Sequence, residues 1–276
     1  MRSAHRSTPP AERRPLVALV AFFVLTLAAT WLCYLPVILA ARGVISVRAD
    51  DQALLRLFGI LAPTLTAFAV VSVTAGRRGA AQLWKSAGRW RFGLRWYAVV
   101  LLAPFVVAVA AVALTRPVSG ADAWFVAPTA AAAVSSIIAP LGEEFGWRGY
   151  ALPRLQRRLS PLAAGVVLGL IWAVWHLPMA FVPGTTQHDA PFAVFTMMIV
   201  GASLLFVWVA AHTGGSVLAA LLLHGAANLS FNTVPVFFRY TGDQWATVVL
   251  AVLYLVIGLV LVLRMQTGSD RPDTER

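Results

Sequence analysis

Residues 15–41 read PLVALVAFFVLTLAATWLCYLPVILAA, and these 27 residues include no Asp, Glu, Lys or Arg. An α-helix needs about 20 apolar residues to cross the hydrocarbon core of a bilayer, so this run is long enough for one crossing. It is also longer than the apolar region of a signal peptide, which has about 7 to 15 residues. The run therefore predicts a permanent transmembrane helix.

The rest of the chain repeats this pattern. Six further runs lack charged residues: 57–75, 96–115, 123–142, 159–187, 190–238 and 244–263. The run 190–238 is too long for one crossing, and Thr213-Gly214-Gly215 supplies a break near its middle. The sequence therefore predicts an all-α, polytopic membrane protein with about eight transmembrane helices.

Composition agrees with this class, because 59% of the 276 residues are hydrophobic, 12% are charged and the mean hydropathy is +0.77. A β-barrel is not expected, since its strands would alternate apolar and polar residues. The single cysteine, Cys33, excludes an internal disulfide framework and a thiolate zinc site.

The formal net charge of +11 reflects the predicted topology. Seventeen of the 22 basic residues fall in the segments 1–14, 76–95, 143–158 and 264–276, which lie on one side of the membrane if the eight helices alternate in direction. The other side keeps five: Arg42, Arg48, Arg56, Arg116 and Arg239. The positive-inside rule then places both termini in the cytoplasm.

Three segments follow from this topology: a basic cytoplasmic tail at 1–14, a transmembrane domain at 15–263 and a cytoplasmic tail at 264–276. We expect the lipid bilayer, and no nucleic acid, as a partner, because no basic soluble domain is predicted. Arginine outnumbers lysine 21 to 1 and alanine is abundant, which is typical of a GC-rich bacterial genome. We expect a multi-pass protein of the bacterial cell (inner or plasma) membrane.

Several ionisable or polar side chains fall within the apolar runs or directly after the run 123–142, and a charge costs about 2.5 to 3.5 kcal/mol at the bilayer centre. They are Glu143, Glu144, Arg148, His176, His224 and Asn228. Such residues are rare in membranes and commonly mark functional sites. An alternative interpretation places the two glutamates in a cytoplasmic loop after the run 123–142.

Hairpin geometry argues against the loop. A turn at 159–161 is equally far along the chain from Glu143 and His176, so the two residues share a depth on consecutive antiparallel helices, about 20 to 25 Å from the turn. Arg154, Arg157 and Arg158 would then mark the inner membrane surface. A carboxylate and an imidazole at one level can form a site.

Helical spacing separates the two glutamates. Glu144 and Arg148 are four residues apart and are expected to form a supporting ion pair, whereas Glu143 points about 100° away without a local partner. His224 and Asn228 are also four residues apart and share one helix face. An alternative is that Glu143, Glu144 and Arg148 form one structural network.

Three other polar residues are weaker candidates. His188, beside Asp189, falls in a loop on the outer side, and His212 lies next to the break at Gly214-Gly215. We expect both histidines to be solvated or interfacial. Asn232 lies four residues after Asn228 and therefore on the same helix face, but it is the weaker candidate of the two.

The three polar segments together resemble the family of CAAX prenyl protease type II and bacteriocin-processing peptidases, called CPBP or Abi. The family's Glu-Glu-x-x-x-Arg motif corresponds to Glu143–Arg148, and its His-x-x-x-Asn motif to His224–Asn228. The intervening Phe-x-x-x-His motif has Trp172 in place of Phe, followed by His176. The resemblance covers about residues 123–232.

The resemblance implies an eight-helix intramembrane endopeptidase whose cavity opens to the cytoplasm. It implies that Glu143 and His176 activate a water molecule while His224 and Asn228 stabilise the oxyanion, with Trp172 in a supporting role. The implied substrate is a membrane-associated protein or peptide, and the sequence does not determine whether it is prenylated. A proton-coupled transporter and a non-proteolytic immunity or assembly factor remain alternatives.

The sequence does not determine whether the reaction needs a metal ion. Glu143, His176 and His224 could ligate a divalent metal such as zinc. No His-Glu-x-x-His motif is present, and a metal-free Glu and His pair explains the same residues. We favour the metal-free interpretation slightly.

Overall fold

The protein is an all-helical bundle in a computed structural model that describes residues 10–118, 123–237 and 241–268. The side chains of residues 10–14 are outside this description. The long helices are α1 (Pro10–Ala41), α2 (Ala49–Lys85), α3 (Leu94–Thr115), α6 (Pro161–His176), α8 (Phe192–His212), α9 (Val217–Thr233) and α11 (Trp245–Gln266). No strand occurs in the described ranges, so the predicted fold class is confirmed.

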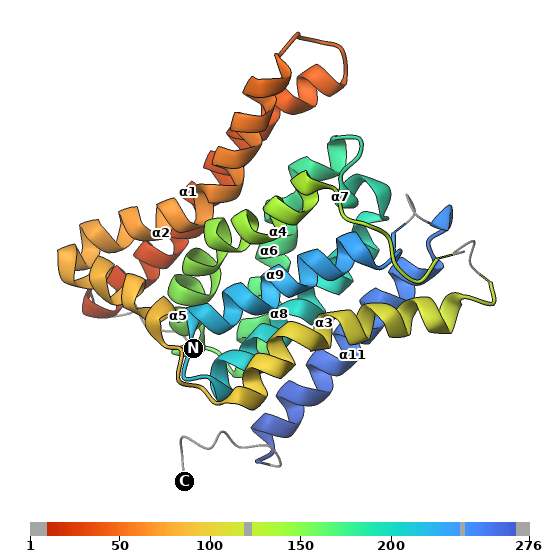
Figure 1. The fold of residues 1–276 in the computed structure, drawn as a ribbon. Coiled ribbons are helices and arrows are strands. Elements are labelled where there is room, and N and C mark those ends of the chain that lie inside the picture. Colours follow the sequence, from red (N-terminus) through yellow and green to blue (C-terminus); the bar gives the residue numbers. More distant parts are fainter. Residues whose placement is uncertain (1–9, 119–122, 238–240, 269–276) are drawn as a thin grey trace, which may run out of the picture.

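Between α3 and α6, residues 130–156 form one nearly continuous helical segment. It begins as α4 (Ala130–Glu144), continues as the π-helix η2 (Phe145–Ala151) and ends as α5 (Leu152–Gln156). Three short elements complete the chain: η1 (Ser86–Gly88), η3 (Leu177–Phe181) and α7 (Thr186–Asp189). Figure 1 shows α1 and α2 as a long hairpin beside the other helices.

The predicted helix breaks are confirmed. Gly214 and Gly215 separate α8 from α9 with φ angles of 61° and 70°, a left-handed conformation that glycine adopts at little cost. Ser160 separates α5 from α6, and its hydroxyl accepts a hydrogen bond from the backbone N–H of Ala163 at 3.2 Å. This contact caps the first turn of α6.

The predicted helix at 123–142 is displaced along the chain. Thr129 is the N-cap of α4, and its hydroxyl accepts a hydrogen bond from the backbone N–H of Ala132 at 3.1 Å. Pro128 disfavours a helical conformation at the residue before it, so the helix begins only at Ala130. The helical segment consequently extends beyond Glu143 and Glu144.

The segment 76–95, which was predicted to connect two helices on the inner side, is itself partly helical. Gly76, with a φ angle of 63°, kinks α2, which then continues to Lys85. The predicted tail at 1–14 also differs, because α1 already begins at Pro10, and residues 1–9 lie outside the described part. Most of the predicted tail at 264–276 lies outside it as well.

Six described helices are long and apolar enough to cross a membrane: α1, α2, α3, α6 with η3, α8 and α11. The apolar helix α9 is shorter, and the segment α4–η2–α5 carries the polar residues. The chain is thus a multi-pass membrane protein. The number of eight crossings and the cytoplasmic location of both termini remain predictions.

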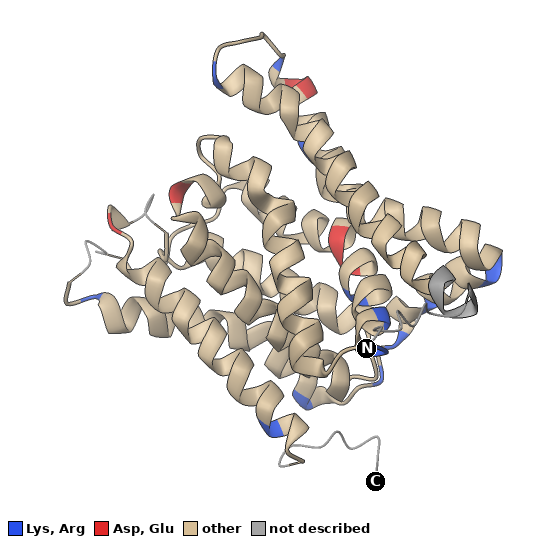
Figure 2. Cartoon of the chain, turned by 180° about the vertical axis from the view of Figure 1, so that it is seen from behind, with Lys and Arg blue, Asp and Glu red and all other residues tan. Residues whose placement is uncertain are grey.

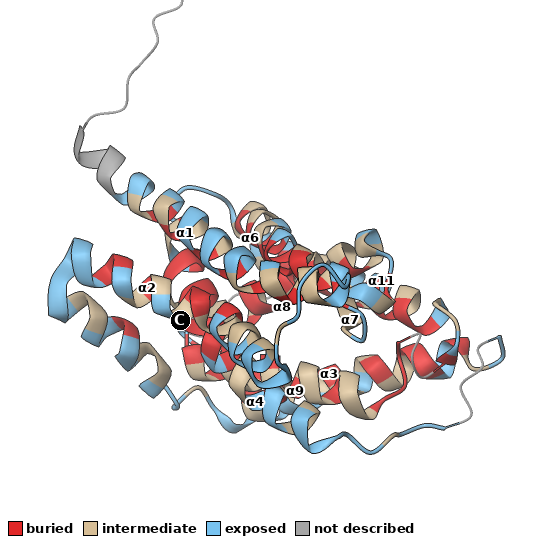
Figure 3. Ribbon diagram, turned by 90° about the horizontal axis from the view of Figure 1, so that it is seen from above, coloured by how far each residue is buried: buried red, intermediate tan, exposed pale blue. Residues whose placement is uncertain are grey.

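Helices α6 and α8 form the centre of the bundle. An apolar stretch of 18 residues is 56% buried in α6 with η3 and in α8, compared with 22% in α1. Helix α8 packs against both α6 and α11, while α9 packs against α3 and α4. Figure 3 shows buried residues on the facing sides of these helices and exposed residues on the outer sides.

The contact between α8 and α11 depends on two glycines. A Cβ atom at Gly201 would overlap the backbone of Tyr254 and Leu255, and one at Gly258 would lie 2.6 Å from the carbonyl oxygen of Gly201. Close approach through small residues is a common mode of helix association in membranes.

We predict that Gly201→Ala destabilises the protein by about 1 to 3 kcal/mol, because an added methyl group has no space between the two backbones. Thermal unfolding in detergent measures this effect. Gly88→Ala is the matched control, since a Cβ at Gly88 meets no atom within 4 Å. Equal melting temperatures of the two variants would contradict the packing described for α8 and α11.

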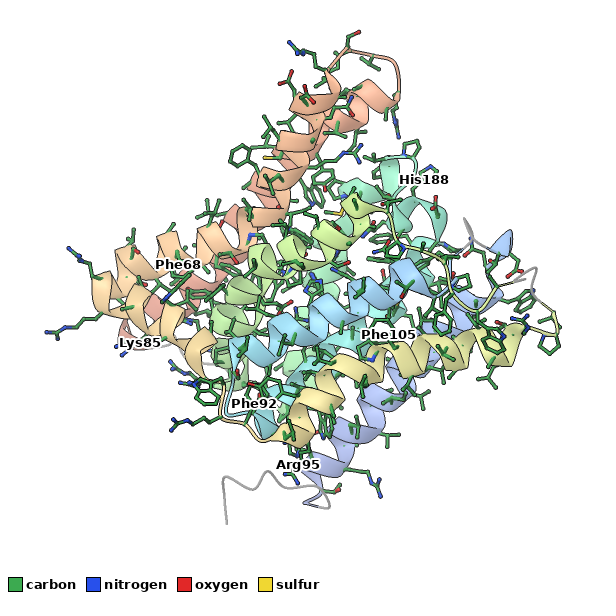
Figure 4. All side chains as sticks on the ribbon, in the orientation of Figure 1. Phe68, Lys85, Phe92, Arg95, Phe105 and His188 are labelled. Carbon is green, nitrogen blue, oxygen red and sulfur yellow. The ribbon has the colours of Figure 1, made fainter. Side chains whose placement is uncertain are left out.

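Basic residues gather at the end of the molecule that the topology places in the cytoplasm, the lower end in Figure 2. In Figure 4, Lys85 and Arg95 lie toward this end, and His188 lies at the opposite end. The arrangement agrees with the side of the membrane predicted for each residue.

Arg91→Cys and His188→Cys, each made in a Cys33→Ala background, test the predicted orientation, because both positions are exposed. A membrane-impermeant maleimide added to right-side-out vesicles should label position 188 at once and position 91 only after the membrane is opened. The reverse pattern would invert the topology.

Candidate active site

Glu143 and Glu144 lie at the end of α4, inside the bundle. Their residues are only 3% and 0% exposed, so the alternative that placed them in a cytoplasmic loop is wrong. The helical segment passes close to α2, because a Cβ at Gly142 would lie 2.6 Å from the carbonyl oxygen of Ile60. Glycine at this position therefore allows the segment with both carboxylates to pack deep in the bundle.

One carboxylate oxygen of Glu144 contacts both an arginine and a histidine side chain. Its Oε1 accepts a hydrogen bond from Nη1 of Arg148 at 2.8 Å, which confirms the predicted ion pair. The same Oε1 lies 2.7 Å from Nδ1 of His224, a contact that joins α4 to α9. A buried carboxylate is tolerated when such partners compensate for its lost hydration.

Arg148 is held by aromatic rings as well as by Glu144. Its guanidinium carbon lies 4.1 Å from the ring centroid of Trp172 and 3.6 Å from that of Phe206. Cation–π contacts of this kind are strongest where the cation is desolvated. Arg148 therefore connects η2 with α6 and α8.

Glu143 accepts hydrogen bonds from two indole groups. Its Oε2 lies 2.8 Å from Nε1 of Trp172 and 3.3 Å from Nε1 of Trp147. The prediction that Glu143 lacks a local partner is therefore wrong, because Trp147 is four residues further along the same segment. An indole N–H only donates, so Oε2 acts as an acceptor and Oε1 remains for a further donor.

His176 presents a defined face of its imidazole. Its Nδ1 lies 2.9 Å from the carbonyl oxygen of Trp172. A carbonyl only accepts, so Nδ1 carries the hydrogen and Nε2 has the lone pair in the neutral ring. The ring is further held by edge contacts with Trp175 and Phe195.

A cavity of about 280 Å³ collects most of the predicted site residues. Trp172, His176, His224 and Asn228 line it, together with mainly apolar side chains of α3, α8 and α11. Glu143 is not part of the lining and contacts the cavity wall through the indole of Trp172. The structure therefore brings two imidazoles and one amide to a common space, with the carboxylate directly behind Trp172.

The weaker candidates lie elsewhere. His188 is in the short helix α7, where its Nδ1 is 3.5 Å from Oδ1 of Asp189. His212 is half-buried and stacks on Trp96. The side-chain amide of Asn232 donates to the backbone carbonyl of Asn228 at 2.8 Å. None of the three lines the cavity.

Sequence reasoning missed two residues of the site. Trp147 could have been found, because a tryptophan four residues after a buried glutamate can reach its carboxylate. Phe206 carried no such signal, since an aromatic residue in an apolar helix is ordinary. Its role depends on how α8 packs against η2.

The donor set does not fit a zinc ion in this conformation. Zinc sites gather three or four ligands around one point. Among the residues that the structure describes, no three His, Cys, Asp or Glu side chains are grouped in this way.

Comparison with known proteins identifies the region that carries the site. The model of the family described as "Type II CAAX prenyl endopeptidase Rce1-like" matches residues 124–230. CAAX prenyl protease 2 of Methanococcus maripaludis is 30% identical over 100 residues, which cover 34% of this chain and 37% of the relative. Lysostaphin resistance protein A of Staphylococcus haemolyticus is 23% identical over 130 residues, which cover 47% of this chain and 34% of the relative.

Each match thus spans about a third of the length of the curated relative. The matched region extends from just before α4 to near the end of α9, and it contains all three sequence motifs. Residues 124–230 are therefore similar to the family described as type II CAAX prenyl endopeptidase Rce1-like, and this similarity covers the part of the chain that forms the site.

Proposed function

We propose that this protein is an intramembrane endopeptidase that hydrolyses a peptide bond of a membrane-associated protein or peptide. The observation that carries the proposal is the common cavity of His176, His224 and Asn228, with Glu143 bonded to its wall. A transporter pathway would need polar groups distributed along a route across the membrane. Here His176, His224 and Asn228 line one cavity, and Glu143 is bonded to Trp172 in its wall.

Glu143 is the proposed general base. Its Oε1 accepts a proton from a water molecule, while both indole groups hold Oε2 and so fix the orientation of the carboxylate. Nε2 of His176 accepts a hydrogen bond from the other O–H of the same water and so orients it, without taking its proton. The water oxygen then attacks the carbonyl carbon of the scissile peptide bond.

Asn228 and His224 are the proposed oxyanion donors. The amide of Asn228 donates directly, and protonated His224 donates through Nε2–H, with its Nδ1–H held by Glu144. Glu143 then returns its proton to the leaving nitrogen as the carbon–nitrogen bond breaks. The apolar surroundings strengthen these hydrogen bonds because little water competes with them.

The substrate is proposed only as a class. One relative is called a CAAX prenyl protease and another a lysostaphin resistance protein. These two names do not point to one common substrate. A cavity with mainly apolar walls suits an extended, apolar segment. We place the protein in the bacterial cell membrane.

Glu143→Gln is predicted to lower peptidase activity by about 10² to 10⁴-fold, the usual contribution of a general base. The amide still accepts from the indole groups, so the fold should persist. Comparative membrane proteomics of the variant strain should detect an accumulated uncut substrate.

Asp51→Asn is the matched control, because it makes the same chemical change at an exposed position at the start of α2. A strain in which Glu143→Gln leaves both the peptide pattern and the phenotype intact would indicate a binding or assembly factor. Activity that instead follows the proton gradient, without cleavage products, would indicate a transporter.

The metal-free mechanism predicts that the purified protein holds far less than one zinc ion per chain and keeps its activity after treatment with a chelator. Elemental analysis and an activity assay measure the two quantities. A stoichiometric zinc ion that disappears in both His176→Ala and His224→Ala would overturn the metal-free proposal.

A further inference from the structure

A second concave site lies at the end of the bundle that the topology places at the cytoplasmic surface. It is a groove of about 870 Å³ between α1, α2 and the segment η2–α5, and it is separate from the cavity described above. Val17, Ala21 and Leu25 of α1 form one wall, and Ala69 and Val73 of α2 form the other.

The groove opens to the outer surface of the bundle. Val17, Leu25 and Val73 are 64%, 52% and 87% exposed, although all three are large apolar residues. In a membrane-spanning helix pair, such side chains face lipid. The walls of the groove are therefore accessible to an acyl chain that lies along α1 and α2.

The end of the groove is basic. Arg154 and Arg157 line it, and no carboxylate whose side chain the structure describes does so. Nη1 of Arg154 donates to the carbonyl oxygen of Tyr150 at 2.9 Å, and its guanidinium carbon lies 3.7 Å from the ring centroid of Tyr150. Arg154 is thus held in place at the end of the groove.

Tyr150 supplies an independent indication of a ligand. Its side chain lines the groove and is 0% exposed, yet its hydroxyl has no hydrogen-bond partner among the described residues. A buried hydroxyl without a partner is costly. An oxygen-rich group bound beside Arg154 would satisfy it.

We propose that this groove binds an anionic phospholipid, with an acyl chain between α1 and α2 and the phosphate at Arg154, Arg157 and Tyr150. Basic pockets between transmembrane helices at the cytoplasmic side suit such headgroups, because arginine forms paired hydrogen bonds with phosphate oxygens. The site is independent of the proposed peptidase function. The lipid would join α1, α2 and η2, the element that carries Arg148.

Native mass spectrometry of the detergent-purified full chain with equal amounts of phosphatidylglycerol and phosphatidylcholine tests the proposal. Phosphatidylglycerol should bind preferentially, and glycerophosphate, which has the phosphate without the chains, should not compete. Arg154→Gln with Arg157→Gln should reduce the preference by about fivefold per arginine. Lys85→Gln with Arg91→Gln, which removes the same charge outside the groove, should leave the preference unchanged.

Two further variants, which keep both arginines, test the proposal if the double arginine variant fails to fold. Tyr150→Phe removes only the hydroxyl and should weaken phosphatidylglycerol binding. Ala69→Trp fills the groove and should abolish preferential binding, whereas Val106→Trp, at an exposed position on α3, should not.

Three results would overturn the proposal. Equal binding of the two lipids would show that the phosphate is not recognised, and competition by glycerophosphate would indicate a phosphate site without an acyl chain. A change of oligomeric state in Ala69→Trp with unaltered lipid preference would assign the groove to a second protein chain.

Discussion

Burial of the Glu144 carboxylate is the constraint on which the arrangement of this protein depends. An unpaired carboxylate in the membrane is strongly disfavoured, and Glu144 is compensated by Arg148 on its own segment and His224 on α9. Arg148 in turn lies against the rings of Trp172 and Phe206. The requirement to compensate one charge therefore joins α4, η2, α6, α8 and α9.

The same network determines the chemistry available to the two glutamates. Glu144 is bonded to a cation and an imidazole, whereas among the described residues Glu143 accepts from the neutral indoles of Trp147 and Trp172. A carboxylate held by neutral donors is not part of an ion pair, and its second oxygen stays available to a further donor. The two adjacent acids thus differ in role because their partners differ: His224 links Glu144 to the cavity, and Trp172 links Glu143 to it.

The class of fold, the helix breaks and the Glu144–Arg148 pair could be predicted from the sequence, because each depends on local patterns: apolar run length, glycine and proline, and helical spacing. The start of α4 was predicted too early, since apolar composition continues across Pro128 and Thr129 and only the cap marks the boundary. Convergence of His224 on Glu144 and the stacking of Phe206 on Arg148 could not be derived, because they depend on crossing angles between distant helices. Glu143 has a local partner, contrary to the prediction, because the indole of Trp147 carries an N–H donor besides its apolar ring.

The π-helix at Phe145–Ala151 has an evolutionary consequence. A π-helical turn holds an additional residue compared with an α-helical turn, and such turns frequently occur at functional sites. Loss of one residue here would rotate everything after it by about 100° relative to Glu143 and Glu144, which would turn Arg148 or Tyr150 away from its contacts. Homologous proteins can therefore vary the length of their surface connections, but insertions and deletions within this one stretch should be absent from lineages that retain the proposed activity.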